Sequence, residues 1–600
     1  MPSASRAMGD DADKLLQVTD YSAGMVTYLG ALALPQNAFS QNTWNVVPFP
    51  GRLKYRGGYS KYSALDGTAD QAVTFYDSDH ERHFAVWRDG DLVDVAAGTE
   101  TVIESGVYTP GQRVGCVALN GILYWSAIGV PLRYWDPVAG TFGAVTQTGP
   151  QDMTGSPYLF LYTNAIVALG VQYDAAAYQP TVMGWSNVND PTYWDASNAQ
   201  AVGPLNEATL QFGLVFGIAN TGVPPTRTFI VGRSDGAGIF SYTGALGTLQ
   251  ENVINCPVGC LDGASAAFIP GADAFGLVVF MGTDYQFWST NGINANPISM
   301  AILDFVTAEA TAAQKAGARF WAGYNEKFAY YFCNVSDKQF VYKWDLKAWS
   351  AFIGVPNGPI LTGEAATDAN GFPSIFIASN DQYLKGFWRF GLAGIGDRAD
   401  DVNEGGTPPQ IVYKSPFLHA GNPELNKIWK WLALYGYNVG TRYRVSVRGM
   451  SRANDGTYME TDELIFNTAS AADANAFQLD VSLLDGPAVL VGQGNSTTGG
   501  QVSPVVMHGR LACPFVPEDD SILRGLTGFT ETLKSNAVQV TVEYYDGPLD
   551  FDILGLQLRY LERGYRFEGG NEYDSEMGVP PNNDPFVPPL SPVDYEQDAS

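Results

Sequence analysis

The sequence predicts an all-β protein in which a β-propeller of about six or seven blades is followed by a β-sandwich. Three observations predict this fold: short runs of β-branched and aromatic residues, turn residues between the runs, and a loose repeat of blade size. Gly (66) and Pro (35) interrupt the 600-residue chain at short intervals, and charged residues make up only 16% of it. This composition is typical of a turn-rich β protein with few long helices.

The propeller is predicted for residues 71–395. Three dipeptides typical of hairpin turns stand between apolar runs: Asp89-Gly90, Asn120-Gly121 and Asp235-Gly236. Such dipeptides are the strongest local signal for a β-hairpin, and a spacing of roughly 40–55 residues between repeats matches four-stranded blades. The most helix-like stretch, residues 300–319, is expected to link two blades.

The ends of the chain differ from this repeat. Residues 1–70 are predicted to form an arm and platform strands, and the polar residues 396–410 form a linker. Segments of residues 411–566 alternate apolar and polar side chains, which indicates an antiparallel sheet with one covered face and therefore a β-sandwich. Residues 567–600 carry eight acids, six prolines and no basic residue, which predicts a flexible or partner-draped tail.

The chain is strongly acidic, with 62 acidic and 34 basic residues and a formal net charge of -28. This balance argues against a protein that grips nucleic acid over a broad surface, because such binding needs a basic footprint. An acidic wall that lets DNA pass without adhesion is compatible with the charge, and so is a protein that is merely soluble. The N-terminus lacks the features of a signal peptide, and no apolar run approaches the ~20 residues that span a bilayer.

Two sets of basic side chains on alternate positions are candidate docking or interface residues: Arg52, Lys54 and Arg56, and Arg442, Arg444 and Arg448. Alternate residues of a strand share one face, so each set would form a charged stripe. For the second set the opposite face carries Tyr443, Val445 and Val447. A solvated strand face is the alternative interpretation.

No catalytic constellation, cofactor motif or metal site is predicted, and we expect the protein not to be an enzyme. His80-Glu81-Arg82-His83 is one residue short of the zincin motif. The spacing of Asp77, Asp79 and Glu81 could hold calcium, but the glycine and the bidentate acid of a full loop are missing. Five cysteines form a sparse, odd set that suits reduced thiols.

Four acids are conceivable members of a carboxylate-based glycosidase site: Asp136, Asp195, Asp284 and Asp345. Three of them follow a Trp, in Tyr134-Trp135-Asp136, Tyr193-Trp194-Asp195 and Lys343-Trp344-Asp345. The favoured interpretation is structural: the Trp wedges between neighbouring sheets and the Asp caps the following turn.

Three segments resemble the tail nozzle or hub proteins of short-tailed bacteriophages, also called tail tubular protein B or DNA-stabilisation proteins. They are Asn45-Val46-Val47-Pro48 with PGRLKYRGGY (50–59), Gly184-Trp185-Ser186-Asn187 with Asp190-Pro191-Thr192-Tyr193-Trp194, and FMGTD (280–284) with Asn296-Pro297-Ile298-Ser299. The resemblance implies that residues 1–70 and 410–566 pair as a platform beside the propeller. It also implies a homohexameric ring that continues the DNA channel of the virion tail, retains the genome and guides its ejection.

The same resemblance implies the partners. These are copies of the chain itself, a head-tail adaptor above, tail fibres or a spike and a tail tip protein below, and double-stranded DNA that passes without sequence-specific binding. Assembly would take place in the host cytoplasm. The distal gate would be built from loops of 140–230 or by another protein. The alternative functions are a β-propeller glycan hydrolase or depolymerase and a receptor-binding module of a tail.

Overall fold

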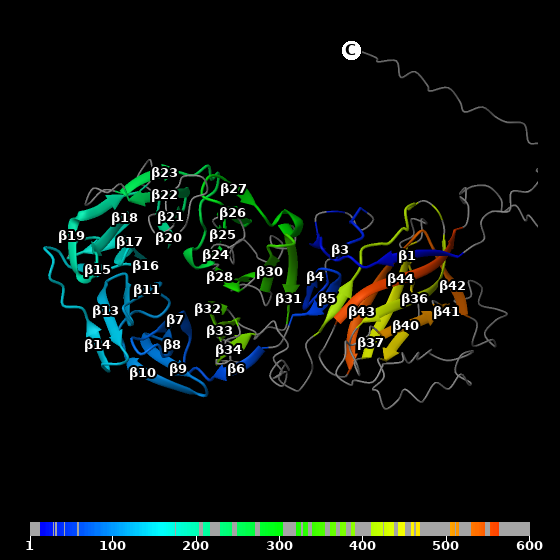
Figure 1. The fold of residues 1–600 in the computed structure, drawn as a ribbon, viewed down its shortest axis with the longest axis horizontal. Coiled ribbons are helices and arrows are strands. Elements are labelled where there is room, and N and C mark those ends of the chain that lie inside the picture. Colours follow the sequence, from blue (N-terminus) through cyan, green and yellow to red (C-terminus); the bar gives the residue numbers. More distant parts are fainter. Residues whose placement is uncertain are drawn as a thin grey trace, which may run out of the picture.

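The computed structural model describes much of the chain, apart from residues 28, 30–32, 41, 175, 424 and 426 within the ranges that follow. These ranges are 13–56, 59–202, 208–215, 228–242, 249–269, 276–303, 320–325, 328–333, 339–353, 360–367, 373–379, 386–390, 410–436, 442–450, 458–460, 464–467, 505–510, 512–514, 530–546 and 552–562. Within them the chain is almost entirely β-strand, and small sheets arranged in a ring lie beside two larger sheets (Figure 1). The predicted all-β fold is confirmed.

Within the described ranges the ring contains seven antiparallel blades, and the predicted propeller is confirmed. Blade 1 has β7 (Ala69–Tyr76), β8 (Arg82–Arg88), β9 (Asp91–Ala96) and β10 (Thr99–Glu104), and blade 2 has β11 (Val114–Leu119), β12 (Ile122–Ala127), β13 (Val130–Asp136) and β14 (Thr141–Ala144). Blade 3 has β15 (Met153–Gly155), β16 (Tyr158–Tyr162), β17 (Ala165–Tyr173), β18 (Gln179–Asn187) and β19 (Asp190–Ala201), and blade 4 has β20 (Leu210–Val215), β21 (Thr228–Arg233), β22 (Gly236–Tyr242) and β23 (Leu249–Val253). Blade 5 has β24 (Ala267–Ile269), β25 (Leu277–Met281), β26 (Phe287–Thr290) and β27 (Ala295–Pro297), and blade 6 has β28 (Phe320–Asn325), β29 (Phe328–Cys333), β30 (Gln339–Lys343) and β31 (Ala348–Phe352). Blade 7 has β32 (Ile360–Thr367), β33 (Pro373–Ser379), β34 (Gly386–Phe390) and β6 (Tyr59–Ser63).

The ring is closed by a strand from the N-terminal arm. β6 pairs antiparallel with β34 and supplies the fourth strand of blade 7, while β32 of that blade packs against β7 of blade 1. β2 (Gly24–Met25) pairs parallel with β31 and, with β3 (Ala38–Phe39), extends blade 6. The propeller therefore includes part of residues 1–70, because pairing strands from distant parts of the chain removes an open edge from the last blade.

Two further sheets form the sandwich. One has the order β4 (Val46–Phe49), β5 (Arg52–Tyr55), β44 (Asp552–Glu562), β36 (Lys427–Gly436), β42 (Thr530–Ser535) and β41 (Ala512–Pro514), with β1 (Lys14–Val18) on β44 and β40 (Val505–Arg510) on β36. The other has β35 (Val412–Lys414), β43 (Ala537–Asp546), β37 (Arg442–Met450) and β38 (Tyr458–Glu460), with β39 (Leu464–Asn467) on β37. Both β1 and β5 pair with β44, so the prediction that the two ends share the sandwich is confirmed.

The sandwich core continues into the propeller. One buried cluster joins residues of both sandwich sheets, such as Leu432 and Val445, to Met281 of blade 5 and Trp349 of blade 6. Burial of apolar surface across this junction favours a fixed arrangement of the two parts.

A hairpin forms at each of the three predicted turns. Between β21 and β22 the turn residues are Ser234 and Asp235, and Gly236 begins β22 without a positive φ. The other two dipeptides form the turns themselves. Asp89 (φ 47°) with Gly90 (φ 95°) connects β8 to β9, and Asn120 (φ 55°) with Gly121 (φ 80°) connects β11 to β12. Positive φ at both positions belongs to the type I′ turn.

Several predicted segments fall partly or wholly outside the described residues. Met300–Ile302, at the start of the helix-like stretch, forms a 3-10 turn, and residues 304–319 lie outside the described part. So do residues 391–409, which cover nearly all of the expected linker, and residues 563–600, which contain the tail.

Candidate functional site

The first basic set lies where the sandwich meets blade 6, and two of its members share one carboxylate. Arg52 and Lys54 each lie 3.6 Å from Oδ2 of Asp552 on the neighbouring β44. Their side chains are 38% and 34% exposed, whereas the Asp552 side chain is 9% exposed. Both cations also lie within 6 Å of the Phe49 ring centroid. The two heads therefore reach solvent, with their charge partly balanced by Asp552.

Arg56 is not part of that exposed stripe, which corrects the sequence-based expectation. Its side chain is wholly buried. Nε donates to Oδ1 of Asn45 at 2.9 Å, and the guanidinium lies 5.8 Å from the ring centroid of Phe352 in blade 6. β5 ends at Tyr55, so the alternation of a strand does not extend to Arg56. Arg56 joins the sandwich to the propeller from the inside.

Asn45, which belongs to the first family-like segment, is the centre of this junction, and nothing in its local pattern predicts a role for its side chain. The residue is wholly buried and has a positive φ of 61°, a region that Asn tolerates better than most residues. Besides Arg56, its Oδ1 accepts from the backbone N–H of Ile353 at 3.0 Å, while Nδ2 donates to the carbonyl of Gln410 at 2.7 Å. One side chain thus ties together the N-terminal arm, blade 6 and the start of the C-terminal half.

The second basic set lies on β37 with the alternation that the sequence predicted. Tyr443, Val445 and Val447 are wholly buried on one side of the strand, and the arginines lie on the other. Arg444 stacks over the ring of Tyr545 at 4.7 Å. Register places Arg444 opposite Glu543 and Arg442 opposite Asp546 of β43. The face is therefore charged in both signs, and its use in docking stays a prediction.

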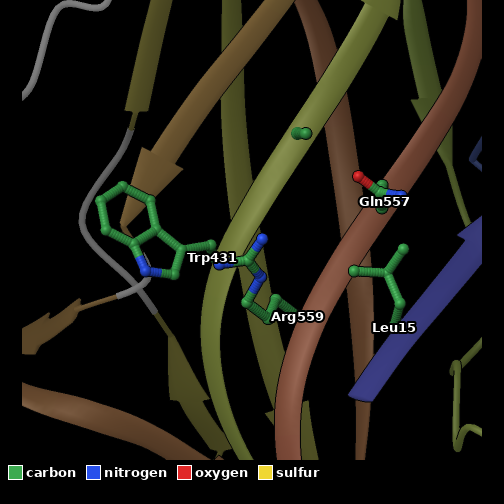
Figure 2. A pocket seen from close by; sticks show the side chains of 5 residues that line it. Leu15, Trp431, Gln557 and Arg559 are labelled. Atoms are coloured by element: carbon green, nitrogen blue, oxygen red, sulfur yellow. The ribbon is translucent and has the colours of Figure 1, made fainter. Parts of the chain in front are cut away.

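A third surface, on the outer face of the β1-β44-β36 sheet, was not predicted. Figure 2 shows Arg559 between Trp431 and Leu15 on this face, and the register pairs Arg559 with both. Together with Ala433 and Gln557 they line a depression of ≈ 240 Å³. Leu15 is 51% exposed and Trp431 38%.

A β-bulge explains why Trp431 faces outward. Trp429 and Trp431 are two residues apart and would share one face of a regular strand. The pairing of β36 with β44 shifts between them, so that Trp429 lies in the core while Trp431 lies outside. Bulges often re-aim a side chain in this way. No local sequence signal marks the bulge.

A depression of ≈ 260 Å³ is lined by inner strands of blades 1 to 4 and by the 3-10 turn Gly263–Ser265 that precedes β24. Arg113 of blade 2 reaches Asp262 before that turn and forms an ion pair with it. Tyr158 of blade 3 donates from its hydroxyl to Gln211 at 3.1 Å, and burial raises the pKa of Tyr158. These polar groups pair with one another between blades.

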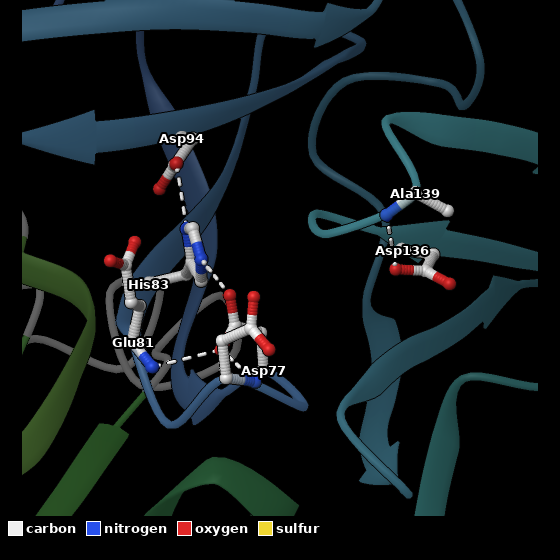
Figure 3. Close-up of polar contacts among 7 residues, drawn as sticks. Asp77, Glu81, His83, Asp94, Asp136 and Ala139 are labelled. Atoms are coloured by element: carbon white, nitrogen blue, oxygen red, sulfur yellow. Dashed lines mark hydrogen bonds and ion pairs between the residues drawn. The ribbon is translucent and has the colours of Figure 1, made fainter.

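Both ring nitrogens of His83 contact aspartate side chains. Its Nδ1 lies 2.9 Å from Asp94 and its Nε2 3.3 Å from Asp77, as Figure 3 shows. The hydrogen bond to Asp94 raises the pKa of His83 although burial acts to lower it. Burial acts to raise the pKa of Asp77, but hydrogen bonds from the Glu81 N–H, from His83 and from the Asp79 N–H bring it below its usual value.

This arrangement engages the Asp77 carboxylate within the 77–83 hairpin. The Asp77 carboxylate is occupied by His83 and two backbone N–H groups. His80 lies in the turn with φ 65°, apart from the strand that carries His83. Across the described residues no group of three or more His, Cys, Asp or Glu side chains is placed to hold a metal ion.

The four candidate glycosidase acids belong to four different blades. Asp136 accepts from the Ala139 N–H at 3.0 Å (Figure 3) and Asp195 from the Ser197 N–H at 2.8 Å, so both cap local turns. Asp284 accepts from the indole N–H of Trp288. Asp345 accepts from Lys343 at 2.5 Å. Each carboxylate is engaged close to its own position in the chain, which agrees with the structural interpretation of the aromatic-Asp patches.

The described cysteines and helices add no functional feature. Cys116, Cys256 and Cys260 are free thiols, and burial raises the pKa of Cys256 and Cys260. Among the described residues there is no helix with the length and apolar character needed to cross a membrane.

Comparison with known proteins gives similarity of structure only. No family model and no curated protein matches the sequence. Similar solved structures include the computationally designed Ika8 protein (9% identity, 55% of this chain, 99% of that chain, TM-score 0.32) and the N-terminal domain of Nup159 (9%, 56%, 96%, 0.32). The β-propeller domain of Cps50 (Swd1) from Myceliophteria thermophila is a third (8%, 55%, 99%, 0.32). TM-scores this low do not support an assignment of fold or function. The assignment of the propeller rests on the strand order within the sheets of this chain.

Proposed function

We propose that the chain is a structural subunit of a closed ring, namely the tail nozzle or hub of a short-tailed bacteriophage. The observation that carries the proposal is the arrangement in which both ends of the chain build one sandwich beside a propeller. This is the organisation that the resemblance to the nozzle and hub family implied. The role requires a rigid subunit and no chemistry.

The three family-like segments supply further support, because each contributes to the framework. The first contains Asn45 and β5 at the junction. The second forms the β18–β19 hairpin, where Ser186 accepts from the Ile166 N–H at 3.0 Å and Trp194 is wholly buried. In the third, the Ser299 hydroxyl accepts from the Phe287 N–H at 2.8 Å. The named side chains of these three segments therefore hold the fold together, as expected of segments shared by proteins with one framework.

On this proposal the ring closes by head-to-tail contacts and lies in the virion tail, with an adaptor above and fibres, a spike or a tip protein below. Native mass spectrometry of the purified protein, alone and with the adaptor, tests the ring. We expect a closed oligomer, six copies by the resemblance. A stable monomer at micromolar concentration, with or without the adaptor, would count against the role.

The net charge of -28 supports a channel with an acidic wall. Such a wall repels the phosphates, so the DNA duplex can slide through the channel without adhering. Loops within residues 140–230 are the proposed gate. Particles with shortened loops in this region should lose packaged DNA. Full DNA retention would refute the gate while leaving the ring untouched.

The principal alternative, a glycan hydrolase, has less support because its four acids lie in four blades and each of them bonds to a residue two to four positions away. Cleavage of capsular polysaccharide that disappears on Asp→Asn substitution would establish it and overturn the structural role. Binding to whole cells by an isolated monomer would favour the receptor-binding alternative.

A further inference from the structure

We propose that the outer face of the β1-β44-β36 sheet binds the proline-rich acidic tail of the same chain. The receptor is the surface formed by Leu15, Trp431, Ala433, Gln557 and Arg559, here called the Trp431 face. The ligand is the segment VPPNNDPFVPPLSPVD (579–594). The inference does not depend on the proposed role in a phage tail.

The chemistry of the Trp431 face suits this ligand. Proline-rich segments bind grooves lined by aromatic residues, because a preformed polyproline II helix loses little entropy on docking. Trp431 and Leu15 give exposed apolar area, and the Tyr435 hydroxyl donates to Gln557 at 2.9 Å, which fixes the amide beside them. The bulge turns Trp431 outward, so its ring is available for an external contact.

Charge complementarity supports the same occupant. Arg559 is exposed, and none of the described acidic side chains forms an ion pair with it. Two other cations on neighbouring positions are engaged, Lys14 with Glu562 and Lys430 with Asp13. The tail beyond Arg566 has acids and no base, and Asp584 and Asp594 lie within its proline-rich part. A guanidinium beside an aromatic ring is suited to an acidic, proline-rich peptide.

The chain geometry favours binding within one molecule. The tail leaves β44 at Glu562, three residues after Arg559, which is about 10 Å along a strand. Residues 563–578 contain Gly569, Gly570 and Gly578. A Gly-containing chain of this length has a mean end-to-end distance of roughly 20–24 Å by general chain statistics, which is enough to reach back to the face. A short linker gives an effective concentration in the millimolar range, so a weak contact suffices.

Photocrosslinking in the full chain tests the proposal. With p-benzoylphenylalanine in place of Phe586, irradiation should join the tail to peptides that contain Trp431 or Arg559, in a product of monomer mass. Trp431→Ala should lower the yield at least about threefold, the effect of losing one aromatic contact. Arg559→Gln should lower it and remove its decrease with added salt. Phe142→Ala is the matched control, because Phe142 is 48% exposed on blade 2, far along the chain from this sheet, and should change nothing.

The readout distinguishes the other occupants. Crosslinks to the same peptides at twice the monomer mass would overturn the assignment to the chain's own tail and indicate exchange between copies. Crosslinks elsewhere, or a yield that Trp431→Ala leaves unchanged while circular dichroism confirms folding, would refute the face as the receptor. None of these outcomes bears on ring formation, which is measured separately by mass.

Discussion

Replacing Asn45 with alanine is expected to weaken the junction between the propeller and the sandwich more than any exposed substitution. The change removes three side-chain hydrogen bonds, with Arg56, Ile353 N–H and the Gln410 carbonyl, in a site closed to solvent. At about 1–1.5 kcal/mol for each of the three broken bonds, and with about 1 kcal/mol for alanine at positive φ, the loss is about 4–5.5 kcal/mol.

The assay is native-state hydrogen exchange followed by mass spectrometry, because one unfolding midpoint is not well defined for a chain with several parts. Peptides covering residues 348–353 and 410–418 report on the two sides of the junction. Their free energy of opening should fall by the stated amount in the variant. A decrease below about 1.5 kcal/mol at both peptides would refute the central role of Asn45.

Asn120→Ala is the matched control for backbone strain. Asn120 also has a positive φ, of 55°, but it is exposed in the β11–β12 turn and makes no side-chain hydrogen bond. Its replacement should therefore cost only about 1 kcal/mol, confined to that hairpin. The difference between the two variants isolates the buried hydrogen bonds.

Three other substitutions test the propeller. The pKa of His83 is raised, so its bonds to Asp94 and Asp77 stabilise blade 1 fully below the pKa of the unfolded chain and less as pH rises through the folded pKa. Thermal stability should therefore fall above about pH 6.5. His83→Gln should flatten this dependence of stability on pH. Arg113→Met removes the partner of buried Asp262 and should lower the free energy of opening by about 3–5 kcal/mol in hydrogen exchange of peptides that cover Asp262, with partial recovery when Asp262→Asn is added. Gly115→Ala would place a Cβ 2.7 Å from the backbone nitrogen of Leu159, so it should cost about 1–3 kcal/mol and speed hydrogen exchange in β16. An unchanged pH slope, a stable Arg113→Met protein or unaltered exchange would contradict the respective argument.

Features set by neighbouring residues were predictable from the sequence. The turns at Asp89-Gly90 and Asn120-Gly121 follow from side chains that tolerate positive φ. The buried Trp194 and the turn-capping Asp195 follow from the aromatic-Asp pattern. The alternation of β37 predicted its buried face for the same reason: successive side chains of a strand point to opposite sides.

Features set by distant pairings were not predictable in this way. Arg56 is buried because blade 6 and Asn45 enclose it, and neither is visible in its local pattern. Tyr59–Ser63 belongs to blade 7 because it pairs with the outer edge of β34, which lies over 300 residues later in the chain. The outward position of Trp431 depends on a shift in pairing with β44. Each case requires the partner strand, so periodicity within one segment cannot supply it.

The N-terminal arm decides how the two parts of the molecule are held. Between residues 13 and 63 it contributes β1 and β5 to the sandwich, β2 to blade 6 and β6 to blade 7. These contacts are spread over three sheets, and those of β1, β2 and β5 continue through one apolar core. A rotation of the sandwich relative to the propeller would therefore have to break strand pairing and expose buried surface together. A docking contact made by the sandwich would therefore set the direction of the propeller axis as well, which is the property that a subunit of a closed ring needs.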